Sequence, residues 1–292
     1  TANIQGLSSA QVAALTTTNV AALETADLAR LTTAAIQGLQ TEDFAVLSTA
    51  QLLGLTTTQI GALLSGQIQA LATAQIALLS SAQIQALNTA NIQGLSSAQV
   101  AALTTTNIAG LESLDLGAIT TEAIQGLETT DIDRLTSTQL QGFVTAQIEQ
   151  LSSAQIQAFN TTNIAGLESL DLGAITTEAI QGLETTDIDR LTSTQLQGFV
   201  TAQIEQLSSA QIQAFNTANI QGLSSAQVAA LTTTNVAALE TADLARLTTA
   251  AIQGLQTEDF AVLSTAQLLG LTTTQIGALL SGQIQALATA QI

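Results

Sequence analysis

Apolar residues recur along the chain with a strict period of eight. Every eighth residue from Leu7 to Leu287 is Leu, Ile or Phe, and a second apolar residue stands three positions before each of them. A Ser or Thr stands three positions before that second residue without exception, as in the octad Thr16 to Leu23, TTTNVAAL. A fixed short period predicts one structural unit stacked on itself many times, in a solenoid or fibre.

A single continuous α-helix does not fit this period. Eight residues at about 100° each leave a remainder of about 80° per repeat, so the apolar stripe would wind around the helix. A β-solenoid is the alternative, because Thr, Ile and Val favour strands. Its inward side chains should alternate with period two, whereas the apolar spacings here are three and five. The Gly-Gly, Asn-Gly or Asp-Gly pairs typical of tight β-turns are also missing.

We therefore predict an all-α solenoid, a superhelix with one very short helix in each octad, and keep the β-solenoid as the alternative. Ala, Gln and Leu dominate the octads and favour helix. The invariant Ser or Thr is predicted to cap each helix by accepting a backbone N–H. The predicted N-caps of the first helices are Ser9, Thr17, Thr25 and Thr33, and the predicted core residues are Val12, Leu15, Val20 and Leu23.

The octads are themselves duplicated in long blocks. Residues 105–160 are identical to residues 161–216, and residues 1–76 are identical to residues 217–292. The duplications keep the octad phase, and no copy has diverged into a private site. We predict one continuous solenoid over residues 1–292, as a segment of a longer array, and expect length and regularity to matter more than any single site.

Composition limits the function classes. The formal net charge of −18 argues against nucleic acid as a partner, because phosphate binding needs clustered Lys or Arg. No apolar run is long enough to span a bilayer, so no membrane insertion is expected. The absence of His and Cys removes most nucleophile–base and transition-metal chemistry, and we expect no catalytic, cofactor or metal site.

Acidic residues are the main candidates for chemistry, since paired carboxylates can bind calcium. The densest pairs are Glu42-Asp43, Asp131-x-Asp133 and Asp187-x-Asp189. They lack the spacing of an EF-hand loop, so we predict that they complement the positive end of each helix dipole. Each of the four Arg residues follows an Asp by three positions, as Arg190 follows Asp187, which predicts a local ion pair.

The stretch LSSAQIQALNTANIQGLSSAQVAALTTTN, of the form LTTxQIxxLTTxQIxxL, resembles the octapeptide-repeat regions of very large secreted bacterial surface proteins, which are often described as adhesin-like. The resemblance covers the whole chain. It implies an extracellular or cell-surface location and a structural or adhesive role, and it carries over no catalytic residue.

We therefore expect a non-enzymatic structural protein, the stalk, spacer or filament body of a bacterial surface or extracellular fibre. Self-association into a homo-oligomer or filament is the expected partnership. The alternative is an adhesive repeat module that binds an unknown surface or matrix ligand along the solenoid. An ice-binding array of Thr side chains is less favoured, because the exposed positions vary too much between octads.

Overall fold

The computed structural model describes residues 2–288 and residue 291. Within these residues the chain is an all-α solenoid of 29 very short α-helices and seven 3-10 helices, with about one helix per octad and no strand. The predicted all-α solenoid is thus confirmed, and the β-solenoid alternative is not supported. The described chain contains no helix that is long and apolar enough to cross a membrane.

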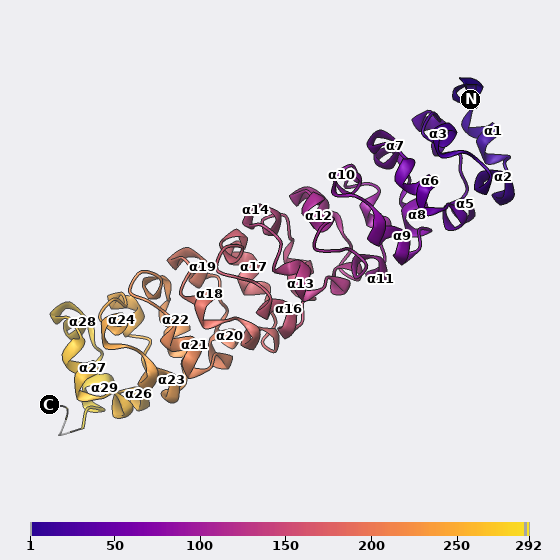
Figure 1. The fold of residues 1–292 in the computed structure, drawn as a ribbon. Coiled ribbons are helices and arrows are strands. Elements are labelled where there is room, and N and C mark those ends of the chain that lie inside the picture. The colour runs from indigo at the N-terminus through magenta and orange to yellow at the C-terminus, as the bar shows by residue number, and fades with distance from the viewer. Residues whose placement is uncertain (1, 289–290, 292) are drawn as a thin grey trace. The chain divides into compact units, whose positions relative to one another are not determined.

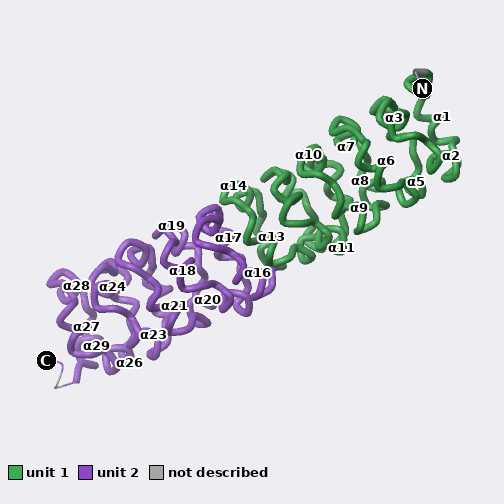
Figure 2. The backbone as a smooth tube through the Cα atoms, in the orientation of Figure 1, with its two compact units in different colours: residues 1–150 green, residues 151–292 purple. Residues whose placement is uncertain are grey.

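The chain comprises two compact units, residues 1–150 and residues 151–292, each described here by itself (Figure 2). The prediction of one continuous solenoid over residues 1–292 stays a prediction. The helices of the first unit are η1 Ala2–Gly6, α1 Ser9–Ala13, α2 Thr17–Ala21, α3 Thr25–Leu28, α4 Thr33–Ile36, α5 Thr41–Val46, α6 Thr49–Gly54, α7 Thr57–Ala62, α8 Ser65–Gln69, α9 Thr73–Leu78, α10 Ser81–Gln85, η2 Ile92–Gly94, α11 Ser97–Val100, η3 Ile108–Gly110, α12 Ser113–Ala118, η4 Ala123–Gly126, α13 Thr129–Ile132, α14 Ser137–Leu140 and α15 Thr145–Ile148.

The second unit is built from the same short elements. Its helices are α16 Ser153–Gln157, η5 Ile164–Gly166, α17 Ser169–Ala174, η6 Ala179–Gly182, α18 Thr185–Ile188, α19 Ser193–Gln197, α20 Thr201–Gln206, α21 Ser209–Gln213, η7 Ile220–Gly222, α22 Ser225–Ala229, α23 Thr233–Ala238, α24 Thr241–Leu244, α25 Thr249–Ile252, α26 Thr257–Val262, α27 Thr265–Gly270, α28 Thr273–Ala278 and α29 Ser281–Gln285.

The chain turns between helices without any special residue. At the junction of α6 and α7, Leu55 (φ −64°, ψ 134°) and Thr56 (φ −71°, ψ 156°) are both extended, and the next helix begins at Thr57. No described residue has a positive φ. Two extended residues are therefore enough to redirect the chain, which explains why the octads need no Gly-rich turn.

Each helix packs on the helix three octads further along the chain. In the first unit α1 contacts α4 and α2 contacts α5, and in the second unit α22 contacts α25 and α23 contacts α26. In this way successive turns of the solenoid, which we call coils, lie against one another within each unit (Figure 1). A helix of four to six residues is unstable alone, so this coil-on-coil packing is what holds the helices in place.

The two apolar positions of the octad form the core of each coil. The first is fully buried in most octads, as in Val12 and Val20 (0% exposed). Leu15 and Leu23, at the second position, are only half-buried, whereas Leu31 in the following octad is 4% exposed. The difference arises because no described coil covers the N-terminal side of residues 2–23. The Phe residues also fill these two positions and are buried.

The predicted N-caps are wrong by one position. Ser9, Thr17, Thr25 and Thr33 are the first residues of α1 to α4, and the caps are Ser8, Thr16, Glu24 and Thr32. A capping hydroxyl must reach the N–H three residues on from an extended backbone. Ser8 meets both conditions, with φ −77° and ψ 163° and its Oγ accepting from the N–H of Gln11.

Candidate functional site

The residue just before the first apolar position is the most heavily used polar group of the octad. It is usually Gln or Asn, and it is buried; Gln59 is 2% exposed. The side-chain oxygen of Gln59 accepts the backbone N–H of Thr56 at 2.9 Å, and the backbone N–H of Gln59 donates to the hydroxyl of Thr56 at 3.2 Å. This reciprocal arrangement is a capping box, and it fixes where α7 begins.

The amide nitrogen of the same side chain links two coils. Gln59 Nε2 donates to the carbonyl oxygens of Leu28 (2.9 Å) and Leu31 (2.8 Å), four octads earlier. The identical copy Gln275 repeats this in the second unit, donating to Leu244 (2.9 Å) and Leu247 (2.8 Å). Helices pack three octads apart and amides bond four octads apart, so one coil holds between three and four octads. We call this group the bridging amide.

Bridging amides recur through both units at the same sequence offsets of 31 and 28 residues. Asn also serves, since Asn107 Nδ2 donates to Ile76 (3.2 Å) and Leu79 (3.2 Å). A buried amide left unpaired would cost free energy, whereas here each satisfies its donors and acceptor together. The apolar period of the sequence did not indicate this bridge. The pattern Ser/Thr-x-x-Gln, a capping-box signature, could have located it.

The preference for a small residue just before the second apolar position is steric. At Gly38, Gly126 and Gly198 a Cβ atom would overlap the carbonyl oxygen of the Ser that stands 29 residues earlier. These Ser residues are the first residues of helices in the neighbouring coil, so Gly allows the ends of two helices to approach closely. No hydrogen bond that recurs among the described residues explains why the first helical position is always Ser or Thr.

Aspartate replaces the bridging amide in several octads. As predicted, these residues lie in the first turn of their helices, as Asp131 and Asp187 do. However, they are buried, with Asp131 2% and Asp187 1% exposed. Burial, with a contribution from the Glu at the N-cap, raises the pKa of Asp187 to about 6, and the pKa values of Asp115 and Asp243 also rise to about 6 for the same reasons.

The predicted Asp187–Arg190 pair is not formed. Both carboxylate oxygens of Asp187 are buried without a hydrogen-bond partner, and Arg190 is exposed. Arg190 occupies the same octad position as Gly198, and its side chain is exposed, whereas the side chain of Asp187 is buried. The sequence spacing was right for a helix pair, but the two positions lie in different environments.

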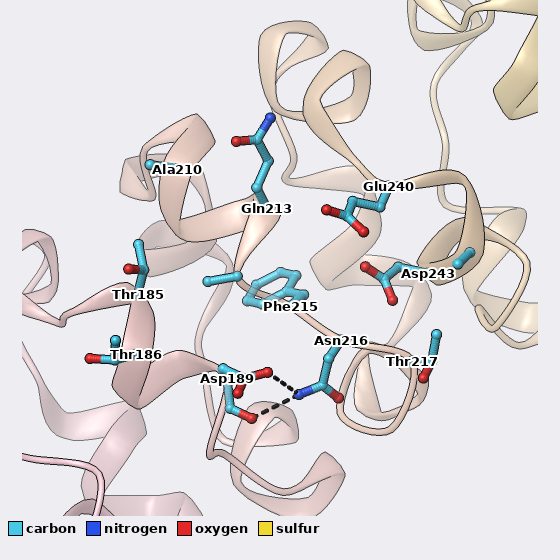
Figure 3. Close-up of a pocket in the computed structure, with 12 residues that line it drawn as sticks. Thr185, Thr186, Asp189, Ala210, Gln213, Phe215, Asn216, Thr217, Glu240 and Asp243 are labelled. Carbon is cyan, nitrogen blue, oxygen red and sulfur yellow. Dashed lines mark hydrogen bonds between the residues drawn. The ribbon is translucent and has the colours of Figure 1, made fainter.

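The second unit contains one open cavity of about 600 Å³ (Figure 3). Phe215 lies at its centre, with Glu240 and Asp243 on one side and Asp189 with Asn216 on the other. Asn216 Nδ2 donates to the backbone oxygen (2.7 Å) and to Oδ1 (2.9 Å) of Asp189. No group of three or more acidic, His or Cys residues in the described chain is arranged to hold a metal ion.

The comparisons with known proteins identify the repeat. The ALTTAQ repeat family matches nine segments of the chain, residues 20–57, 36–73, 76–113, 108–145, 164–201, 182–217, 209–239, 236–263 and 252–289. A comparison with curated proteins finds no similar sequence. Because the matched segments together cover well over half of the residues, the chain belongs to the ALTTAQ repeat family.

Proposed function

We propose that this chain is a non-enzymatic structural protein, a solenoid that serves as the stalk, spacer or filament body of a bacterial surface or extracellular fibre. The observation that carries the proposal is the bridging amide, which joins coil to coil at the same offsets in both units, as Gln59 and Gln275 do. A role that depends on reach needs cohesion at every coil and no unique site, and the duplicated blocks meet that need.

The surface supports the same proposal. The chain carries 22 acidic and four basic residues, so mutual repulsion limits random aggregation. Most side chains at the coil interface are apolar or amide, and the amides donate to backbone carbonyl oxygens of an earlier coil. Such an interface is suited to repetition, and we propose that it also permits self-association through identical octads.

Deletion of residues 161–216 tests the spacer role. The deleted block equals residues 105–160, so the new junction between residues 160 and 217 reproduces the native junction of residues 216 and 217. Seven octads make about two coils, and packed helices lie about 8–10 Å apart. We expect an unchanged circular dichroism spectrum per residue and a maximum dimension shorter by about 20 Å in small-angle X-ray scattering.

A shortened protein that keeps its helical signal supports the spacer. Loss of the helical signal would show that the block is a specific folding element, and an unchanged maximum dimension would show that the coils do not set the length. Electron microscopy of the full chain gives a second check, because images of compact monomers alone would contradict the fibre role.

A further inference from the structure

Eight octads carry Asp where most others carry a bridging amide, and this substitution changes what the position can do. An amide accepts one hydrogen bond and donates two, whereas an ionised carboxylate only accepts. Within the second unit, Gln195 donates to Ile164 (3.3 Å) and Leu167 (2.9 Å), and Gln211 donates to Ile180 (3.0 Å) and Leu183 (2.9 Å).

The same offsets of 31 and 28 residues identify the groups opposite Asp187 as the carbonyl oxygens of Ile156 and Phe159. An ionised Asp187 places acceptors against acceptors in a buried interface, and neither of its oxygens has a hydrogen-bond partner. Its copy Asp131 has one unpartnered oxygen and stands at the same offsets from Val100 and Leu103 in the first unit. A buried charge without a partner is costly, and a neutral carboxyl that can donate is not.

We propose that Asp131 and Asp187 are proton-controlled links between coils: protonation lets the carboxyl donate to a carbonyl oxygen of the neighbouring coil, and ionisation removes that hydrogen bond. The coils with Gln or Asn stay linked at every pH, so only the Asp-bearing coils respond. This inference goes beyond the proposed spacer role and stands or fails separately from it.

The groups around Asp187 favour its neutral form. Glu184, the N-cap of α18, contributes a second negative charge and accepts from Gln157 Nε2 at 2.7 Å. Helix α21, which packs against α18, carries no titratable side chain, and neither do η5 and α16, the elements three and four octads before α18. Asp189 and Arg190 follow the helix on its exposed side, and Glu240 and Asp243 line the cavity beside Thr185.

The sign of the pH effect follows from the raised pKa. The pKa of Asp187 is raised from its ordinary value of 3.8 to about 6 in the folded chain. The folded state therefore binds the proton more tightly, and the penalty is present in full above about pH 6. This penalty is relieved as the pH falls toward 4, and the constant for local opening then decreases by at most about a hundredfold.

The test compares three proteins by native-state hydrogen exchange at about pH 5 and about pH 7.5, with intrinsic rates corrected. Asp131→Asn and Asp187→Asn are combined in one variant, because the duplicated blocks yield identical peptides. The control combines Glu149→Gln with Glu205→Gln, two exposed copies that remove the same charge. The measured segments are residues 129–135 and 185–191.

In the wild-type chain and in the control, we expect the opening constant of residues 185–191 to fall about tenfold between the higher and the lower pH, and that of residues 129–135 to fall in the same direction. In the Asn variant, both segments should stay protected at both pH values. A wild-type segment that opens equally at both pH values would overturn the proposal, and so would an Asn variant that keeps the response. Infrared absorption of protonated carboxyl in the wild-type chain near pH 5 gives an independent check, and its absence would also overturn the proposal.

Discussion

At the scale of single residues, one side chain in most octads performs two tasks. Gln51 is 3% exposed and accepts the N–H of Ser48 at 2.9 Å, and its Nε2 donates to Val20 and Leu23 at 2.9 Å each. A polar residue in this place both starts its own helix and fastens it to an earlier coil. A burial pattern drawn only from apolar positions therefore underestimates the core.

Close approach of backbones sets the choice of Gly at the residue scale. Gly126→Ala should lower stability by about 1–3 kcal/mol, because its Cβ would overlap the carbonyl oxygen of Ser97 and the coil must shift. Gly66→Ala is the matched control, since the nearest atom to its Cβ would be Thr41 Cγ2 at 3.8 Å. Helix propensity makes this second change neutral or stabilising by about 0.5–1 kcal/mol. Thermal unfolding followed by circular dichroism distinguishes them, and equal midpoints would contradict the steric explanation.

Sequence alone located the core residues but not the polar contacts. Val12 and Val20 follow from the apolar period, because burial at a fixed spacing is a local property of the octad. The link from Gln59 to Leu28 and Leu31 spans four octads, and its offset depends on how many octads make one coil. That number is set by the packing of whole helices, so it could not be obtained from the octad itself.

At the scale of the helix, the cap decides where each element begins. The prediction assigned the cap to the invariant Ser or Thr, such as Ser9, which is one residue beyond the actual cap Ser8. The cap position is in fact variable, and Leu64 or Ala72 can occupy it, because the N3 side chain still accepts the cap N–H. The most regular residue of the repeat is thus not the one that performs the capping.

Helix α10 offers a direct comparison of the two adjacent Ser residues. Ser80→Ala should cost about 0.5–1.5 kcal/mol, because Ser80 Oγ accepts the N–H of Gln83 at 3.2 Å. Ser81→Ala removes only an exposed hydrogen bond to Thr106, at 3.3 Å, and should cost less than half as much. Urea unfolding of both variants measures the difference. A larger loss of stability in Ser81→Ala than in Ser80→Ala would show that the invariant residue is the functional cap.

At the scale of the whole molecule, stability comes from repetition of one coil-to-coil contact within each unit. The helices are too short to persist alone, and every coil contributes the same burial and the same amide links. The chain therefore gains its length by adding octads in phase, as the copies at residues 105–160 and 161–216 do. The Asp-bearing coils are the exception, and they make cohesion depend on pH.

The buried bridging amide, more than helix propensity or surface contacts, holds the coils together. Gln83 and Gln85 lie in the same helix, α10, within residues 77–88, a segment that occurs once in the chain. Gln83 is 4% exposed and donates to Leu52 (3.2 Å) and Leu55 (3.3 Å), whereas Gln85 is exposed.

Native-state hydrogen exchange of residues 77–88 in Gln83→Ala and Gln85→Ala is the most direct measurement of this claim. Loss of the bridge leaves buried groups unpaired, so Gln83→Ala should lower the local opening free energy by about 2–3 kcal/mol, and Gln85→Ala by less than about 0.5 kcal/mol. Equal protection of the segment in the two variants would contradict the account.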